Sequence, residues 1–302
     1  MKKLTFSLLM LCVITGMVAG CGKENTDTID NTMTQGVLQG VFSIGEGKQI
    51  HFSQGVLQYQ ASTNTWRFAT EQYDYSGADN ENISATYDGW IDNFAWGTSG
   101  WAESGATAYM PYSILAEADL YLIGGTHTVD LIGDYANADW GVYNAISNGG
   151  NKAGLWRTMT AQEWKYLLDE RPNAHKLRSI AHVCGHYGIL LLPDNWNRKD
   201  IPFTPEATYN VNNYNTETWP ALQEAGAVFL PATGYRTVKA IGVQERIGMY
   251  WSVKANKAST EYIYAVVFHT GIDDKNGAWS IYPNGECQRF LGIPTRLVRD
   301  IE

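Results

Sequence analysis

A helix start at Thr160 is the feature that most constrains the fold of this chain. Glu163 follows three residues later, the pattern of a capping box, in which each residue's side chain accepts a hydrogen bond from the backbone N–H of the other. The apolar residues at 164, 167 and 168 then fall on one face, and Pro172 ends the segment. The sequence therefore predicts an amphipathic helix that packs one side against a core.

Short runs of β-branched and aromatic residues lie on both sides of this helix. Strands are expected within 41–52 and 55–69, where residues 61–64 form a turn, and as a hairpin of 180–183 with 189–192 around Cys184 and Gly185. A second helix is expected over Trp219–Glu224, capped by Thr218 and ended by Gly226. The later strands are expected within 228–230, 249–251, 262–268, 279–282 and 295–298. This order of elements indicates an α+β fold and not an alternating βαβ array.

The first 20 residues have the composition of a secretion signal. Two lysines precede an apolar run over 4–17, and small residues follow before Cys21. The run is short for a transmembrane helix, which is the competing interpretation. Residues 18–21 (VAGC) resemble the lipobox of bacterial lipoproteins, which implies that Cys21 is lipidated and anchors the protein in the bilayer. We expect an outer-membrane location, exposed at the cell surface or facing the periplasm.

Residues 21–37 are polar and are expected to form a disordered tether, because they offer little apolar surface to bury. Lys23-Glu24 resembles the export signal of surface lipoproteins from Bacteroides-like bacteria, and residues 27–29 (DTI) resemble their O-glycosylation site, with Thr28 as acceptor. We therefore expect a signal peptide over 1–20, a tether over 21–37 and a single domain over 38–302. Within that domain, we expect a β-rich N-terminal part over about 38–110 and a core part over about 155–302.

Net charge and aromatic content indicate which classes of binding partner the protein favours. Without residues 1–20 the chain has 20 basic and 31 acidic residues, a formal charge of −11, which disfavours nucleic acid and anionic lipid. The 11 Trp and 18 Tyr residues suit a binding surface, although any single Trp is more often part of a core. Residues 76–110 show little periodicity, which indicates a loop region that is either functional or packed down by its own aromatic residues. The candidate ligand-binding residues there are Trp90, Trp96, Trp101 and Tyr109.

The chemistry-bearing residues leave several alternatives open. Cys184 and Cys287 could pair in an oxidising compartment or remain free. His182, Cys184 and His186 alternate as zinc ligands can, but Gly185 indicates a turn there. Asp273, Asp274 and Asn276 could bind calcium, although the sequence favours an ordinary Asp-Asn-Gly turn there. No other cofactor is indicated.

Pairs of acidic residues, such as Asp88 with Asp92 or Glu163 with Asp169, could in principle serve as the two carboxylates of a glycosidase. That chemistry depends on the separation of the two groups, which the sequence does not give. The nucleophile-elbow, zinc-protease and phosphate-loop motifs are absent from the sequence.

Several segments resemble one known superfamily. These are residues 156–167 (WRTMTAQEWKYL), 188–196 (GILLLPDNW), 226–236 (GAVFLPATGYR), 250–252 (YWS) and 295–300 (TRLVRD). They are similar, in order, to the Fibrobacter-type major paralogous domain of Bacteroides-group surface lipoproteins and to the formylglycine-generating enzyme (sulfatase-modifying factor) superfamily. Residues 88–92 (DGWID) and 96–100 (WGTSG) resemble the N-terminal half of the same lipoproteins. The resemblance implies a C-type-lectin-like α+β domain with short strands, two main helices and long aromatic-rich loops.

The resemblance carries no catalytic assignment. The enzyme of the superfamily uses a pair of cysteines, whereas Cys184 and Cys287 lie about 100 residues apart in sequence and match no catalytic motif. We therefore expect a non-catalytic lipoprotein that binds a glycan or a protein. The alternatives are an enzyme of the formylglycine-generating type, active or degenerate, and a pilus-tip or outer-membrane assembly subunit.

Overall fold

The structure is a computed structural model that describes residues 35–301. The expected signal peptide, the lipidation site Cys21, the glycosylation candidate Thr28 and most of the expected tether lie outside the described residues. Val37, which the sequence places in the tether, forms an antiparallel bridge with Ser53, so the folded part begins before residue 38. Residues 35–301 belong to one unit of the chain. Over this range, no helix combines the length and the apolar composition needed to span a bilayer.

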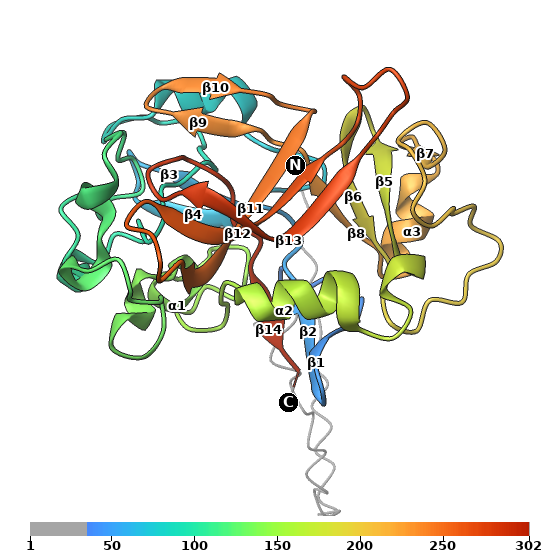
Figure 1. Ribbon diagram of the computed structural model, residues 1–302, viewed down its shortest axis with the longest axis horizontal. Helices are drawn as coiled ribbons and strands as arrows, with labels where there is room; N and C mark the ends of the chain where they lie inside the picture. Colours follow the sequence, from blue (N-terminus) through green and yellow to red (C-terminus); the bar gives the residue numbers. More distant parts are fainter. Residues whose placement is uncertain (1–34, 302) are drawn as a thin grey trace, which may run out of the picture. The chain divides into compact units, whose positions relative to one another are not determined.

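The first and last strands of the described chain share a sheet. β2 (Lys48–Phe52) lies between β1 (Phe42–Gly45) and β14 (Val298–Asp300), and both pairings are antiparallel (Figure 1). Phe52 pairs with Val298, and both side chains are fully buried. This pairing closes the fold, because it joins the N-terminal and C-terminal ends of the described chain.

β3 (Leu57–Gln60) and β4 (Thr65–Phe68) form an antiparallel hairpin, with the turn over 61–64 that the sequence predicts. Asn64 closes this turn with a φ of +50°, a left-handed conformation that Asn tolerates better than most residues. Its side-chain oxygen accepts a hydrogen bond from the Tyr59 hydroxyl at 3.0 Å. The turn is therefore held to the strand that precedes it.

The predicted capping box is confirmed at the start of α2 (Ala161–Lys165). Thr160 Oγ1 accepts from the Glu163 N–H at 3.1 Å, and Glu163 Oε2 accepts from the Thr160 N–H at 2.7 Å. The helix continues as a π-helical turn, η7 (Tyr166–Glu170), and ends before Pro172. The apolar face that the sequence predicts, with Trp164 at its start, is fully buried.

A four-stranded sheet follows, in the order β7 (Asn213–Tyr214), β5 (Arg178–Val183), β6 (His186–Leu191) and β8 (Val228–Pro231). The predicted hairpin around Cys184 and Gly185 is confirmed as β5–β6. One face of the sheet packs in the same core as Trp164 and the other packs against α3 (Trp219–Glu224). α3 has the predicted bounds, but the Thr218 cap is wrong, because the Thr218 hydroxyl bonds to Asn215 instead of to the helix.

The remaining strands form two antiparallel sheets. β11 (Ile247–Ala255), β12 (Tyr262–His269) and β13 (Ser280–Gln288) pair in chain order, and β9 (Tyr235–Thr237) pairs with β10 (Ala240–Gly242). The strands predicted within 228–230, 249–251, 262–268 and 279–282 overlap β8, β11, β12 and β13, whereas β14 begins only at Val298, the last residue of its predicted range. β9 and β10 were not predicted from the sequence.

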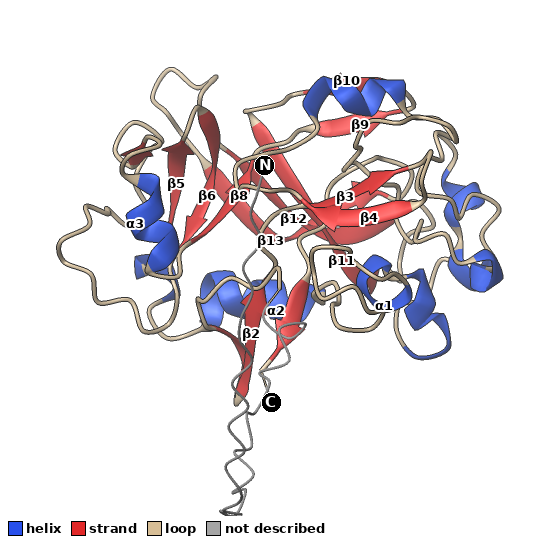
Figure 2. Ribbon diagram, turned by 180° about the vertical axis from the view of Figure 1, so that it is seen from behind, coloured by secondary structure: helices blue, strands red, loops and turns tan. Residues whose placement is uncertain are grey.

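The segment between β4 and α2 is mostly loop (Figure 2). It contains α1 (Trp140–Tyr143) and the 3₁₀ helices η2 (Gly77–Asn82), η3 (Ala102–Ser104), η4 (Ala118–Tyr121), η5 (Ile123–Gly125) and η6 (Gly133–Ala138); η8 (Ala174–Lys176) follows η7. Trp96, Trp140 and Trp156 of this segment are buried together in one hydrophobic core cluster. Among residues 35–301 the fold is α+β, with small sheets and few helices, as the sequence indicates.

Candidate functional site

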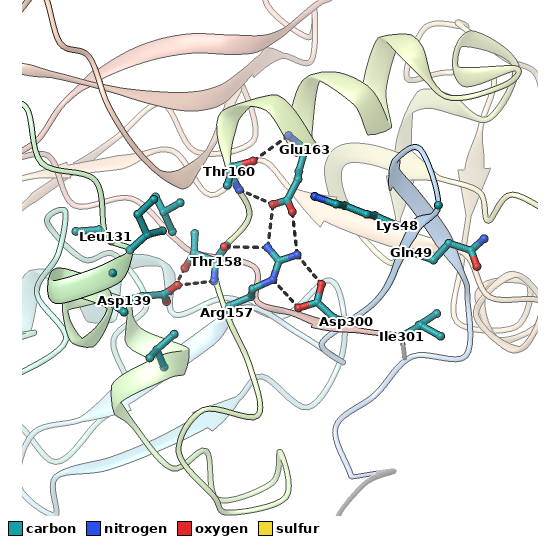
Figure 3. A pocket seen from close by; sticks show the side chains of 16 residues that line it. Lys48, Gln49, Leu131, Asp139, Arg157, Thr158, Thr160, Glu163, Asp300 and Ile301 are labelled. Carbon is teal, nitrogen blue, oxygen red and sulfur yellow. Dashed lines mark hydrogen bonds and ion pairs between the residues drawn. The ribbon is translucent and has the colours of Figure 1, made fainter.

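A cleft of about 560 Å³ lies beside the start of α2 (Figure 3). Its walls come from the β1–β2 turn, the 131–142 segment, the strand that leads into α2 and the end of β14. An adjoining pocket of about 430 Å³ shares Ile132, Thr160 and Val253 with it. The charged residues of the larger cleft are Lys48, Asp139, Arg157, Glu163 and Asp300. We refer to this region as the α2 cleft.

Arg157 forms ion pairs with two carboxylates of the α2 cleft at once. Its guanidinium donates to both oxygens of Glu163 at 2.8 and 2.9 Å, and to both oxygens of Asp300 at 2.8 and 2.6 Å (Figure 3). The hydrogen bonds from Arg157 hold the pKa of Asp300 below its usual value. These charged groups therefore serve to hold β14 against the start of α2.

Asp139 is the most buried acid of the α2 cleft. Its carboxylate accepts from the Thr158 N–H at 2.8 Å, the Thr158 hydroxyl at 2.9 Å and the Gly141 N–H at 3.1 Å. Burial raises the pKa of Asp139 to about 6, although these hydrogen bonds and the charge of Arg157 act in the opposite direction. Asp139 thus ties α1, which it caps, to the strand that precedes α2.

Three of the four acids in the pairs noted in the sequence are engaged in structural contacts, and the fourth, Asp88, is exposed. Glu163 belongs to the capping box and the Arg157 ion pair, and Asp169 pairs with Arg178 at 2.7 Å. Asp92 is fully buried, where it accepts from Asn80 Nδ2 at 2.9 Å. These three carboxylates hold the fold together, and none faces a reactive partner.

The four aromatic residues predicted to bind a ligand do not line one cavity. Trp96 is fully buried, and its Nε1 donates to the Ser252 carbonyl at 2.9 Å, so the expectation that it is exposed to a ligand is wrong. Trp90 is partly buried, with the Arg67 guanidinium 3.7 Å from its ring centroid.

The other two predicted residues, Trp101 and Tyr109, lie in the 99–112 loop, which forms one wall of a smaller pocket. Trp101 is partly buried and packs edge-on against Tyr135, with ring centroids 6.4 Å apart. The carbonyl of Tyr109 accepts from the Gly100 N–H at 2.9 Å, which closes the 100–109 loop. The predicted region is therefore close to a pocket, but the predicted side chains do not line it.

This pocket, of about 270 Å³, lies between the β3–β4 turn, the 99–112 loop and the end of α1. We call it the tyrosine pocket. Tyr143 is 40% exposed and Tyr112 is partly buried, so the pocket opens to solvent beside Tyr143. Its lining residues are Tyr59, Ala61, Asn64, Ala85, Ser99, Gly100, Met110, Tyr112, Tyr143 and Asn144.

Buried indoles and one amide hold the walls of the tyrosine pocket in place. Trp140 Nε1 donates to the Thr98 carbonyl at 3.1 Å, and the Ser99 hydroxyl donates to the Asn137 carbonyl at 2.6 Å. Asn144 Nδ2 donates to the Ser99 carbonyl at 2.9 Å. Trp96, which anchors the same loop from the core, is a positioning residue and not a ligand contact.

The tyrosine pocket differs from the α2 cleft because its polar groups remain available. Within residues 35–301 neither the Tyr112 hydroxyl nor the Tyr143 hydroxyl makes a hydrogen bond, and Asn64 Nδ2 and Asn144 Oδ1 are also unpaired. These atoms offer donors and acceptors to a ligand without breaking any internal bond. No spacing pattern in the sequence marks these residues. Only the turn at 61–64 was predictable, because the other walls meet through tertiary contacts.

Cys184 and Cys287 are both free thiols, so the disulfide considered from the sequence is not formed. Cys184 lies in the β5–β6 turn with a φ of +51°, whereas Cys287 is buried in β13 beside Met249, with 3.5 Å between the two sulfurs. The two cysteines belong to different sheets. The sequence left the pairing open because the spacing of two cysteines does not show which strands lie side by side.

The two metal sites considered from the sequence are not assembled. In the part of the chain that the structure describes, no three His, Cys, Asp or Glu side chains are grouped to hold a metal ion. Each of His182 and His186 instead contacts another residue through Nδ1, Asn213 at 3.0 Å and Glu245 at 2.9 Å respectively.

The acidic turn near residue 274 has structural partners as well. Asp274 accepts from the Asn276 N–H at 2.7 Å and the Ala278 N–H at 3.1 Å, and Asp273 forms an ion pair with Arg246 at 3.1 Å. These contacts are those of an ordinary Asx turn and account for the carboxylates without calcium.

Comparisons with known proteins give no relative for this chain: no protein-family model, no curated protein and no solved structure matches it significantly.

Proposed function

We propose that this chain is a lipid-anchored surface protein whose tyrosine pocket binds a glycan without catalysis. The observation that carries the proposal is the set of unpaired neutral groups beside two tyrosine rings in one concave site. Tyrosine presents an apolar face to the C–H groups of a sugar ring and a hydroxyl to its polar edge. Amide side chains supply directed hydrogen bonds in the same site.

The anchor and the finer fold family are parts of the same proposal. Residues 18–21 support lipidation of Cys21 and an outer-membrane location, and the 156–167 and 295–300 segments support a lectin-like domain akin to the formylglycine-generating enzyme superfamily. Mass measurement of the N-terminal peptide tests the anchor: an acylated Cys21 supports it, and an unmodified chain beginning at Met1 contradicts it.

The enzymatic alternative has less support from the geometry. An enzyme of the formylglycine-generating type uses two cysteines together, whereas Cys184 and Cys287 lie in different sheets. Cys287 is also only 2% exposed, which leaves its thiol without access to a substrate. The α2 cleft offers no substitute, because its carboxylates are bonded to Arg157, Thr158 and Thr160.

The assembly-subunit alternative requires an open edge strand near the N-terminus. β1 is such an edge strand, but Asp194 covers it: the Ser43 N–H donates to Asp194 Oδ2 at 2.7 Å, and the Asp194 N–H donates to the Val41 carbonyl at 3.0 Å. These contacts occupy the backbone groups that a partner strand would use.

The test is a glycan array probed with the full chain purified in detergent. Tyr112→Ala removes one wall of the pocket and is expected to abolish binding. Tyr282→Ala, which removes a 53% exposed ring on β13 outside the pocket, is the matched control and is expected to leave binding unchanged. Binding that survives Tyr112→Ala places the site elsewhere, and capture of a protein with no glycan bound contradicts the proposal.

A further inference from the structure

We infer that the tyrosine pocket accepts one uncharged sugar ring at the end of a glycan and excludes sugars that carry a carboxylate or a sulfate. This inference rests on the proposed function and adds to it the class of sugar.

The charge of the pocket is the first argument. None of its lining side chains is charged, in a chain whose formal net charge is −9. A carboxylate or sulfate that entered would lose water without gaining a cationic partner, a cost that neutral hydroxyls do not incur. The α2 cleft shows the contrast, since Lys48 and Arg157 line it.

The size of the pocket is the second argument. Its volume of about 270 Å³ lies below the range of about 300–1,000 Å³ typical of sites for drug-sized ligands. The pocket therefore has room for a single ring and not for an internal stretch of a chain. The exposed edge of Tyr143 marks the side from which the rest of the glycan would extend into solvent.

The available atoms are the third argument. Asn64 Nδ2 is a free donor and Asn144 Oδ1 a free acceptor, while the two tyrosine hydroxyls can act as either. A sugar hydroxyl is likewise both donor and acceptor, so neighbouring hydroxyls can be satisfied in pairs. Ala61, Ala85 and Met110 supply apolar lining for the C–H face of the same ring.

Free monosaccharides test the inference directly. Saturation-transfer NMR on the full chain in detergent compares glucose, galactose, mannose and N-acetylglucosamine with glucuronic acid and N-acetylneuraminic acid. At least one neutral sugar is expected to bind, in competition with the glycan found on the array, and the acidic sugars are expected to bind at least tenfold more weakly.

A charge-introducing variant sharpens the test. Ala85 is exposed and lines the pocket, so Ala85→Lys places a cation there at little cost to folding. It is expected to raise the affinity for glucuronic acid relative to glucose at least fivefold. Thr216→Lys, at an exposed position outside the pocket, adds the same charge to the chain and is expected to leave that ratio unchanged.

These experiments distinguish a failure of the sugar selectivity from a failure of the proposed glycan binding. Acidic sugars that bind the unmodified chain as tightly as neutral ones overturn the selectivity while the proposed glycan function stands. Absence of binding to any sugar, free or on the array, overturns both.

Discussion

Asn144 donates through its side-chain amide to the Ser99 carbonyl at 2.9 Å, which ties the end of α1 to the 99–112 loop. A second bond reaches the Trp140 carbonyl at 3.1 Å. Because both walls of the tyrosine pocket depend on this amide, Asn144→Ala is expected to lower the free energy of unfolding by about 1–2 kcal/mol and to weaken glycan binding. Urea unfolding and array binding measure the two effects. Asn195→Ala, in an exposed loop, serves as the control, and equal behaviour of the two variants contradicts the role of Asn144.

Thr160 and Thr218 both occupy the N-cap position of a helix, so substitutions at the two can be compared directly. Thr160 caps α2 through its hydroxyl, whereas Thr218 precedes α3 without bonding to it. Thr160→Ala is therefore expected to cost about 1 kcal/mol and Thr218→Ala about half as much or less, since only the first leaves a helix N–H without its partner. Thermal and urea unfolding of both variants decide this, and the reverse ranking would show that the capping box contributes little.

Asp139 gives the stability of the protein a specific pH dependence. Burial raises its pKa from 3.8 to about 6, so the native state keeps this proton over a range where the unfolded chain has released it. The contribution of this group to the free energy of unfolding therefore falls as the pH rises from about 4 to about 6, by about 3 kcal/mol in total.

Asp139→Asn removes this dependence. Urea unfolding of the variant and the unmodified chain from pH 4.5 to 7.5 is expected to show their difference shifting in favour of the variant as the pH rises. Asp88→Asn, at an exposed position, should follow the unmodified chain throughout. Parallel profiles for Asp139→Asn and the unmodified chain would rule out the raised pKa.

The two free cysteines should differ in reactivity. Burial raises the pKa of the Cys287 thiol to about 12, and Cys184 is partly exposed in the β5–β6 turn. Alkylation with iodoacetamide at pH 8, followed by peptide mapping, is expected to modify Cys184 in the native protein and Cys287 only after unfolding. A peptide containing both residues joined by a disulfide contradicts the structure.

Local signals predicted the elements of this fold well. The capping box at Thr160, the bounds of α3 and the hairpin at Cys184 follow from residues within a few positions of one another. Local sequence could not predict the Thr218 contact, because both Asn215 and the backbone N–H groups at the start of α3 are close enough to bond to its hydroxyl. The choice of Asn215 over the helix depends on the turn that the backbone makes there.

The candidate site was predicted less well, for a physical reason. Trp96 and Trp101 have the same side chain in the same loop region, yet only Trp96 is directed into the core, where it bonds to Ser252 more than 150 residues away. Tyr112, Tyr143 and Asn64 meet only because three separate segments converge. Such convergence is a property of tertiary packing, and no short pattern encodes it.

The pairing of β2 with β14 bears on the order of folding events during synthesis. Phe52 has no strand partner on that side until Val298 has left the ribosome, so the first sheet stays open while nearly all of the chain is made. Because the strand that completes this sheet is synthesised last, the native fold forms slowly, and the sheet that holds the N-terminal strands remains incomplete until β14 pairs with β2.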